Sequence, residues 1–240
     1  GRGHHRRVFF RRVVRVGVGD ASSPARPQAN VVLSALPANA RSVSIAPGGR
    51  TAALVLVEGH GAIWTFPVTA AGAPAGEPRR LRDGAHPAFS PDGRRLAYDN
   101  GAEIRVMDVD GSADRRVIAG GRRVAYPTWA SDRRLFGMRW VGLSPYLVEA
   151  DLETGAVIER LALPEATSFP RMAPDQDTVV ATLGEPLNTV GRGSLAAGTF
   201  SAWPRFEGYG FPVWSPDGRR LALERKDGEH MAMYLADADT

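Results

Sequence analysis

Apolar and polar residues alternate along most of this chain with a period close to two, which is the spacing of a strand that buries one face. The apolar stretches are short and end in turns rich in glycine, proline and aspartate, such as Ser90-Pro91-Asp92-Gly93. No stretch keeps the helical period over three turns. The pattern therefore predicts an all-β protein built from many short strands.

One strand-turn-strand segment recurs along the chain. Residues 87–98 and 212–223 share the run Ser-Pro-Asp-Gly-Arg-Arg-Leu-Ala, and weaker copies begin at residues 43, 127 and 170. The second proline position of the motif falls at residues 47, 91, 131, 174 and 216, in steps of 44, 40, 43 and 42 residues. Further strands follow the motif, as at 103–108 and 115–118. Four antiparallel strands in a repeat of about 40–45 residues predict the blades of a β-propeller.

The spacing divides residues 1–240 into the blades of a single propeller domain. We expect blades at about 43–86, 87–126, 127–169 and 170–211, with partial blades at 1–42 and 212–240. Six copies, incomplete at both ends, indicate a six-bladed propeller that is a fragment of a longer chain. Alternatively, the two end pieces complete one another, because propellers often close with strands from both chain ends.

The run Phe-Ser-Pro-Asp-Gly-Arg-Arg-Leu-Ala-Tyr at 89–98, with Ile-x-Val-Met-Asp-x-Asp-Gly-Ser at 104–112, resembles the WD-like repeat of TolB-type β-propellers. The resemblance covers nearly the whole chain and is closest at 87–118 and 212–240. It implies a bacterial cell-envelope protein in the periplasm or another extracytoplasmic place. No signal peptide is visible in this chain, so the sequence itself leaves the cytoplasm open. Related repeats also occur in prolyl-oligopeptidase-type peptidases.

Charge and composition remove several classes of function. The chain has 30 Lys+Arg against 26 Asp+Glu and a sequence pI near 9.9, but six of its arginines fall in residues 1–16. The rest is close to neutral, so we expect no nucleic-acid partner. We interpret the arginine-rich start as a strand with solvated side chains, and an arm that binds a membrane surface or nucleic acid is the alternative. The absence of cysteine excludes disulfides and thiolate metal sites. No apolar run is long enough to span a membrane.

Motifs for catalysis and metal binding are weak. The run Asp108–Asp114 lacks the spacing of a calcium loop. Asp92 and Asp217 are expected to bond the backbone of their own turns. Arginine pairs after the turn are expected to meet nearby acids rather than bind phosphate: 94–95, 133–134 and 219–220. Because no Gly-x-Ser-x-Gly motif or spaced histidine pair is present, we expect no catalytic residue, no metal and no cofactor.

Two columns of side chains follow from aligning the copies. The third motif position is expected to be buried between blades and holds Ile45, Phe89, Trp129, Met172 and Trp214. The residue just before each first strand is expected to face the central channel at one rim. These candidate binding residues are Ser42, His86, Tyr126, Phe169 and Phe211. Packing beneath loops is the alternative explanation for the second column.

The leading hypothesis is a monomeric, non-catalytic binding module that presents one rim and its channel mouth to a protein or peptide partner. The alternative is the gating propeller of a prolyl-oligopeptidase-type serine peptidase whose catalytic domain lies outside this chain. A third hypothesis, a small-molecule hydrolase or lyase built in the channel, would need acidic residues or histidines at the mouth, and the candidate ring supplies few of them.

Overall fold

The computed structural model describes residues 10–11, 36–37, 40–47, 49–58, 60–69, 75–184, 188–227 and 230–238. Every regular secondary-structure element in these ranges is a β-strand, so the prediction of an all-β protein is confirmed. The chain divides into two compact units, residues 1–87 and 88–240, which are described one at a time. Most of the predicted partial blade at 1–42, including the arginine-rich start, lies outside the described residues.

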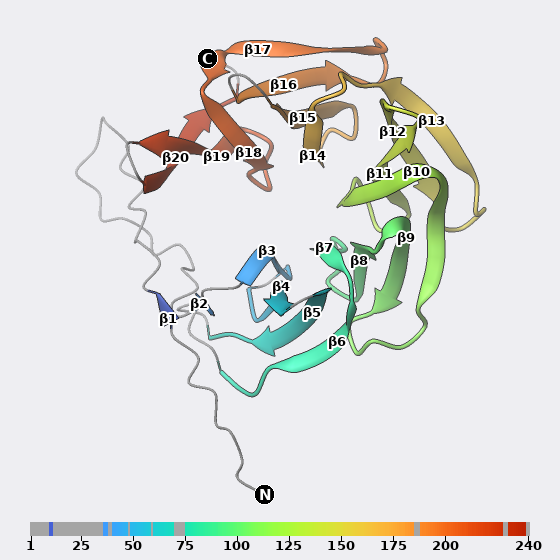
Figure 1. Ribbon diagram of the computed structural model, residues 1–240, viewed down its shortest axis with the longest axis vertical. Coiled ribbons are helices and arrows are strands. Elements are labelled where there is room, and N and C mark those ends of the chain that lie inside the picture. The colour runs from blue at the N-terminus through green and yellow to red at the C-terminus, as the bar shows by residue number, and fades with distance from the viewer. Residues whose placement is uncertain are drawn as a thin grey trace, which may run out of the picture. The chain divides into compact units, whose positions relative to one another are not determined.

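The first unit contains a four-stranded sheet whose strands follow chain order (Figure 1). Its strands are β3 (Ala40–Ile45), β4 (Thr51–Glu58), β5 (His60–Pro67) and β6 (Arg79–Asp83). Each strand pairs antiparallel with the next. A separate two-stranded sheet joins β1 (Phe10–Arg11) to β2 (Leu36–Pro37). The four-stranded meander is the arrangement expected of one propeller blade.

The second unit contains three sheets that also follow chain order. A seven-stranded sheet begins with β7 (Ala85–Phe89), which crosses the boundary between the units, and continues with β8 (Arg95–Asp99), β9 (Gly101–Asp108), β10 (Arg115–Trp129), β11 (Arg134–Val141), β12 (Ser144–Asp151) and β13 (Val157–Ala162). A four-stranded sheet consists of β14 (Thr167–Met172), β15 (Thr178–Leu183), β16 (Thr189–Ser194) and β17 (Thr199–Glu207). The last sheet consists of β18 (Tyr209–Trp214), β19 (Arg220–Asp227) and β20 (His230–Asp237).

The seven-stranded sheet exists because β10 is one continuous strand of 15 residues. Its first part pairs with β9 and its last part pairs with β11. A register shift between Ala119 and Val124 separates the two parts, and the pair Gly120 and Gly121 lies inside it, with φ of 88° and 81°. Sequence reasoning expected two separate strands here. The predicted boundary between residues 126 and 127 therefore falls within a strand.

Apolar side chains pack between successive sheets of the second unit. Phe136, Met138 and Leu147 from the seven-stranded sheet share a cluster with Met172 and Val179 from the next sheet. A second cluster joins the last two sheets and consists of Val180, Val190, Phe206, Leu221 and Leu223. Sheets that pack against one another in this way bury the apolar side chains that lie between them.

The residue at the third motif position is buried as predicted in two copies, and the prediction of burial is wrong in one. Phe89 and Met172 are buried, while Trp129 and Trp214 are partly buried. Ile45 is 39% exposed, so the prediction that it belongs to the core is wrong. Ile45 is the last residue of β3, the opening strand of the four-stranded sheet in the first unit.

The Ser-Pro-Asp-Gly turns are held by their own side chains. Asp92 Oδ1 accepts hydrogen bonds from Ser90 Oγ at 2.6 Å and from the backbone N–H of Arg94 at 2.9 Å. The other close copy repeats both bonds, with Asp217 Oδ1 accepting from Ser215 Oγ at 2.6 Å and from the N–H of Arg219 at 3.0 Å. The prediction that these two aspartates bond their own turns is confirmed.

The same bonds make the turns sensitive to acid. The hydrogen bond from Ser215 lowers the pKa of Asp217 below its ordinary value, because it stabilises the ionised carboxylate. A carboxylate with a depressed pKa stabilises the fold above the pKa of the unfolded chain, about 3.9, and this contribution is lost as the pH falls. We expect Asp217→Asn to be less stable than the wild type at pH 7 and the gap to shrink below pH about 4. Urea unfolding of the wild type and Asp217→Asn at pH 7 and below pH about 4 measures this difference in stability. A difference that does not depend on pH would contradict a stabilising role for the ionised Asp217 carboxylate.

Candidate functional site

The five candidate residues of the sequence alignment share one unusual backbone conformation. Their φ angles are positive and fall within a narrow range: Ser42 49°, His86 49°, Tyr126 59°, Phe169 53° and Phe211 51°. In four of the five the residue lies inside a register shift between its own strand and the next strand of the chain, namely Ser42, Tyr126, Phe169 and Phe211. The alignment therefore identified one recurrent backbone position, a bulge in the strand that carries the residue.

Three of these left-handed residues carry a large aromatic side chain. The left-handed region costs a residue with a Cβ about 1–2 kcal/mol, and glycine or asparagine is the usual occupant. Tyr126, Phe169 and Phe211 occupy it nonetheless. Strain of this kind persists only where the surrounding structure imposes it, and it is concentrated at functional sites.

Side chains from earlier strands supply part of that restraint for Tyr126 and Phe211. The backbone N–H of Tyr126 donates to Asp99 Oδ2 at 3.1 Å, and the N–H of Phe211 donates to Thr182 Oγ1 at 2.8 Å. Asp99 and Thr182 are both buried, and each is the fifth residue of its strand, β8 and β15. β8 lies in the same seven-stranded sheet as Tyr126, whereas β15 lies in the sheet before that of Phe211. The two bonds satisfy N–H groups that leave the regular ladder at the bulge.

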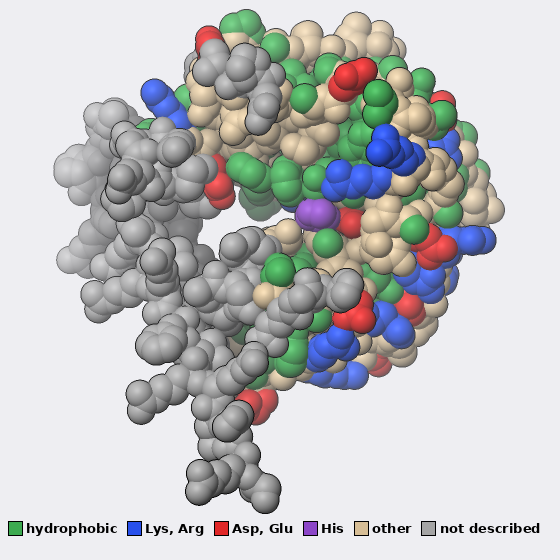
Figure 2. Space-filling model, in the orientation of Figure 1, with side chains coloured by type: hydrophobic (Ala, Val, Ile, Leu, Met, Phe, Trp, Pro, Cys, Tyr) green, Lys and Arg blue, Asp and Glu red, His purple; other side chains and the backbone are tan. Residues whose placement is uncertain are grey.

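The three aromatic rings form a continuous line across β10, β14 and β18. The ring centroids of Tyr126 and Phe169 are 4.5 Å apart, and those of Phe169 and Phe211 are 4.8 Å apart. Exposure rises along this aromatic line, from 8% at Tyr126 to 37% at Phe211. Figure 2 shows hydrophobic side chains next to basic ones over the region where Figure 1 draws β10, β14 and β18. Ser42 and His86 lie in the first unit and are not placed relative to this line.

Two arginines lie beside the aromatic line, and sequence reasoning missed both. The Arg123 guanidinium lies over the rings of Tyr126 and Trp140, at 5.3 and 4.9 Å from their centroids, and its Nη2 donates to the Tyr126 hydroxyl at 3.3 Å. Arg171 follows Phe169 by two residues in β14, and its Nη1 donates to the Pro170 carbonyl at 2.9 Å. Neither belongs to the recurrent arginine pair after the turn, so the repeat pattern gave no signal for them.

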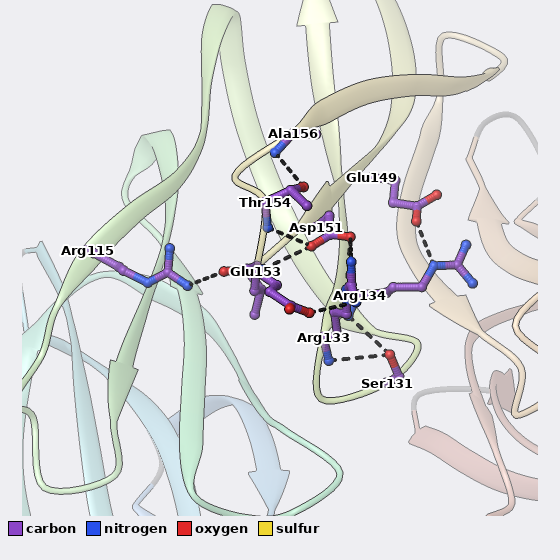
Figure 3. Close-up of polar contacts among 10 residues, drawn as sticks. Arg115, Ser131, Arg133, Arg134, Glu149, Asp151, Glu153, Thr154 and Ala156 are labelled. Atoms are coloured by element: carbon purple, nitrogen blue, oxygen red, sulfur yellow. Dashed lines mark hydrogen bonds and ion pairs between the residues drawn. The ribbon is translucent and has the colours of Figure 1, made fainter.

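The recurrent arginines take part in ion pairs within the sheets. Figure 3 shows Arg133 against Asp151 and Glu153, and Arg134 against Glu149. The hydrogen bond from Arg133 is the main cause that holds the pKa of Asp151 well below its usual range. Arg220 likewise pairs with Asp237. The expectation that these arginines meet nearby acids is confirmed for 133, 134 and 220.

The Asp-Gly turn at 108–114 is also accounted for by internal bonds. Asp110 Oδ1 accepts from the Ser112 N–H at 2.8 Å, while Asp114 accepts from Arg105 Nε and the Tyr98 hydroxyl. Within the described ranges no group of three His, Asp or Glu side chains is arranged to hold a metal ion. The candidate site in the second unit is the aromatic line with Arg123 and Arg171.

Comparison with solved structures gives the fold. The putative TolB from Agrobacterium tumefaciens matches 86% of this chain and 80% of its own, at 16% identity and a TM-score of 0.69. TolB from Acinetobacter baumannii matches 83% of this chain at 18% identity and a TM-score of 0.67. The acylaminoacyl peptidase of Pyrococcus horikoshii matches 82% at 19% identity and a TM-score of 0.54. The chain has a β-propeller fold, and the predicted number of six blades stays a prediction.

This chain spans 52% of the Acinetobacter protein and 38% of the peptidase. No protein-family model matches the sequence, and no curated protein matches it. Among the residues that the structure describes, none forms a helix long and apolar enough to cross a membrane. The similarity therefore establishes the fold, and function has to be argued from the residues.

Proposed function

We propose that this chain is a non-catalytic β-propeller module that binds a protein or peptide partner through the face carrying the aromatic line. The observation that supports this most is the choice of residue at the strained position. Glycine would adopt φ near 50° without a Cβ penalty, yet Tyr126, Phe169 and Phe211 stand there. Tyr126 is buried, while Phe169 is partly exposed and Phe211 is exposed, and large aromatic side chains at strained, accessible positions are typical of binding surfaces.

The chemistry of the line fits a peptide. Tyrosine and phenylalanine offer large, rigid contact area at a small cost in conformational entropy. Arg123 adds hydrogen-bond donors next to Tyr126 and is exposed. Ser42 and His86 share the backbone conformation of the line, and we propose that they belong to the same rim of the propeller, as the TolB-type resemblance implies.

The same resemblance supports an extracytoplasmic location in bacteria and a monomeric propeller, and both are part of the proposal. Their support is the repeat motif and the likeness in fold to the two TolB structures. Fractionation of the native host with an antibody against this chain tests the location. Recovery with cytoplasmic markers alone would overturn it.

The binding proposal is tested by selecting peptides from a random display library on the wild type and on Phe169→Asn/Phe211→Asn. Asparagine tolerates the left-handed region, so the double variant removes two rings without adding strain. We expect the wild type to enrich a peptide family that the double variant does not retain. Leu143→Asn is the matched control, since Leu143 is a 65% exposed apolar side chain outside the line. Equal enrichment on all three proteins would refute the proposal.

A second candidate function is the gating propeller of a serine peptidase. The likeness to the propeller-containing acylaminoacyl peptidase is the observation that favours it. Its test is the reading frame of the native gene: a downstream Gly-x-Ser-x-Gly motif followed by an aspartate and a histidine would support it. A complete gene without these residues would exclude it.

A further inference from the structure

Arg171 has no acidic partner within 4 Å among the described residues, and it is partly buried, whereas most other arginines of the second unit that lack such a partner are exposed. Other arginines pair with carboxylates within 4 Å: Arg105, Arg116, Arg133, Arg134, Arg139, Arg160 and Arg220. The hydrogen bond of Arg171 Nη1 to the Pro170 carbonyl is a contact with the backbone of its own strand. A backbone carbonyl satisfies one of the five guanidinium N–H groups and neutralises no charge.

The Arg171 side chain is also only partly exposed to water. The side chain keeps some exposed surface, yet burial of the guanidinium lowers its pKa from 12.5 to about 10. It remains positively charged at neutral pH. A desolvated charge without a counter-ion costs free energy, and an incoming anion that replaces the lost water recovers part of that cost.

Its position in the sheet places this charge beside the aromatic line. Arg171 stands in β14, whose Phe169 is the middle ring of the line, and its Nη1 lies 2.9 Å from the carbonyl of the residue that follows Phe169. At the equivalent position the neighbouring first strands carry Thr128 and Val213, which are uncharged. The repeat therefore does not require a cation here, and β14 alone in the second unit provides one.

We propose that Arg171 binds a carboxylate of the peptide partner while the aromatic line holds an apolar side chain next to it. This inference rests on the proposed function and specifies the ligand as a peptide with a free carboxylate beside an aromatic or large aliphatic residue. Guanidinium and carboxylate form two parallel charge-assisted hydrogen bonds, the strongest pairing open to an arginine. Arg123, stacked at the Tyr126 end, adds positive charge to the same line.

Three small probes test the inference: N-acetyl-phenylalanine, N-acetyl-aspartyl-phenylalanine amide and N-acetyl-phenylalanine amide. They carry a terminal carboxylate, a side-chain carboxylate and no carboxylate. Titration is followed by NMR through the arginine Nε–H resonances and the aromatic resonances, with probe up to about 20 mM, because a fragment of this size is expected to bind with a Kd near 1 mM. We expect at least one carboxylate probe to shift the Arg171 resonance saturably and to bind about tenfold tighter than the amide.

Arg171→Met should remove that preference, and Arg94→Met, which removes an exposed turn arginine, should leave it unchanged. The melting temperature of Arg171→Met is expected to equal or exceed that of the wild type, because the variant no longer buries an unpaired charge. If Arg171→Met fails to fold, Arg171→Lys takes its place and should weaken the carboxylate probe while keeping the charge.

Carboxylate and amide probes that bind equally to the aromatic line would overturn the carboxylate assignment and leave the binding surface intact. An absence of any shift at Arg171 up to the highest concentration would overturn it as well. Failure of the proposed function itself would appear elsewhere, as equal peptide enrichment on the wild type and on the double asparagine variant.

Discussion

Gly121→Ala is expected to destabilise the second unit by about 3 kcal/mol or more. Gly121 lies in the register shift of β10 with φ of 81°, where an added Cβ costs about 1–2 kcal/mol. A Cβ there would also press against the backbone carbonyl oxygen of Trp140, closer than real Cβ atoms approach. Because a backbone atom cannot rotate away, the β10–β11 pairing must shift.

Gly120→Ala is the matched control for this effect. Gly120 has φ of 88°, and a Cβ there would meet no atom within 4 Å. Gly120→Ala should therefore lose only about 1–2 kcal/mol of unfolding free energy, which is the cost of a Cβ at positive φ. Chemical denaturation of both variants measures the difference. Equal losses would show that the β10 register shift has no close packing against Trp140.

Asp99→Ala is expected to cost about 2–3 kcal/mol. Asp99 is 3% exposed and accepts the backbone N–H of Tyr126 at 3.1 Å, so its loss leaves a buried donor without its partner. It also removes a restraint that holds Tyr126 in the left-handed region, and we expect the Tyr126 ring resonances to change with it.

Asp99→Asn serves as the control, because the amide oxygen can still accept the Tyr126 N–H. It should lose less than half as much stability as the alanine variant. Thr182→Val repeats the test at the equivalent bond to the Phe211 N–H. Unchanged stability and unchanged Tyr126 resonances in Asp99→Ala would contradict the role assigned to this bond.

The repeat made the fold and the turns predictable. Asp92 and Asp217 bond their own turns because the Ser-Pro-Asp-Gly sequence closes locally, with no help from distant residues. The strand order followed from the period of about 42 residues, because consecutive antiparallel strands with short turns become neighbours. The turns and the strand order can therefore be predicted from local sequence.

The candidate site was only partly predictable. Alignment of the copies grouped Tyr126, Phe169 and Phe211, but nothing in these residue types indicates a left-handed backbone. Tertiary hydrogen bonds, such as the one that the Tyr126 N–H donates to Asp99, help to impose that conformation. Nothing in the sequence singles out Arg171, because what distinguishes it is burial without an acidic partner among the described residues. Burial depends on how the sheets assemble. Ile45 was assigned to the core from its repeat position alone, and its exposure depends on the sheets around it.

A calorimetric titration tests whether strained aromatic residues form the binding surface. A peptide selected on the wild type is titrated calorimetrically into the wild type and Phe211→Asn, after their unfolding free energies are compared. We predict that Phe211→Asn stays within about 1 kcal/mol of wild-type stability, because relief of strain offsets the loss of a 37% exposed ring. Peptide affinity should fall about tenfold or more. Undiminished affinity in a stably folded Phe211→Asn would contradict it.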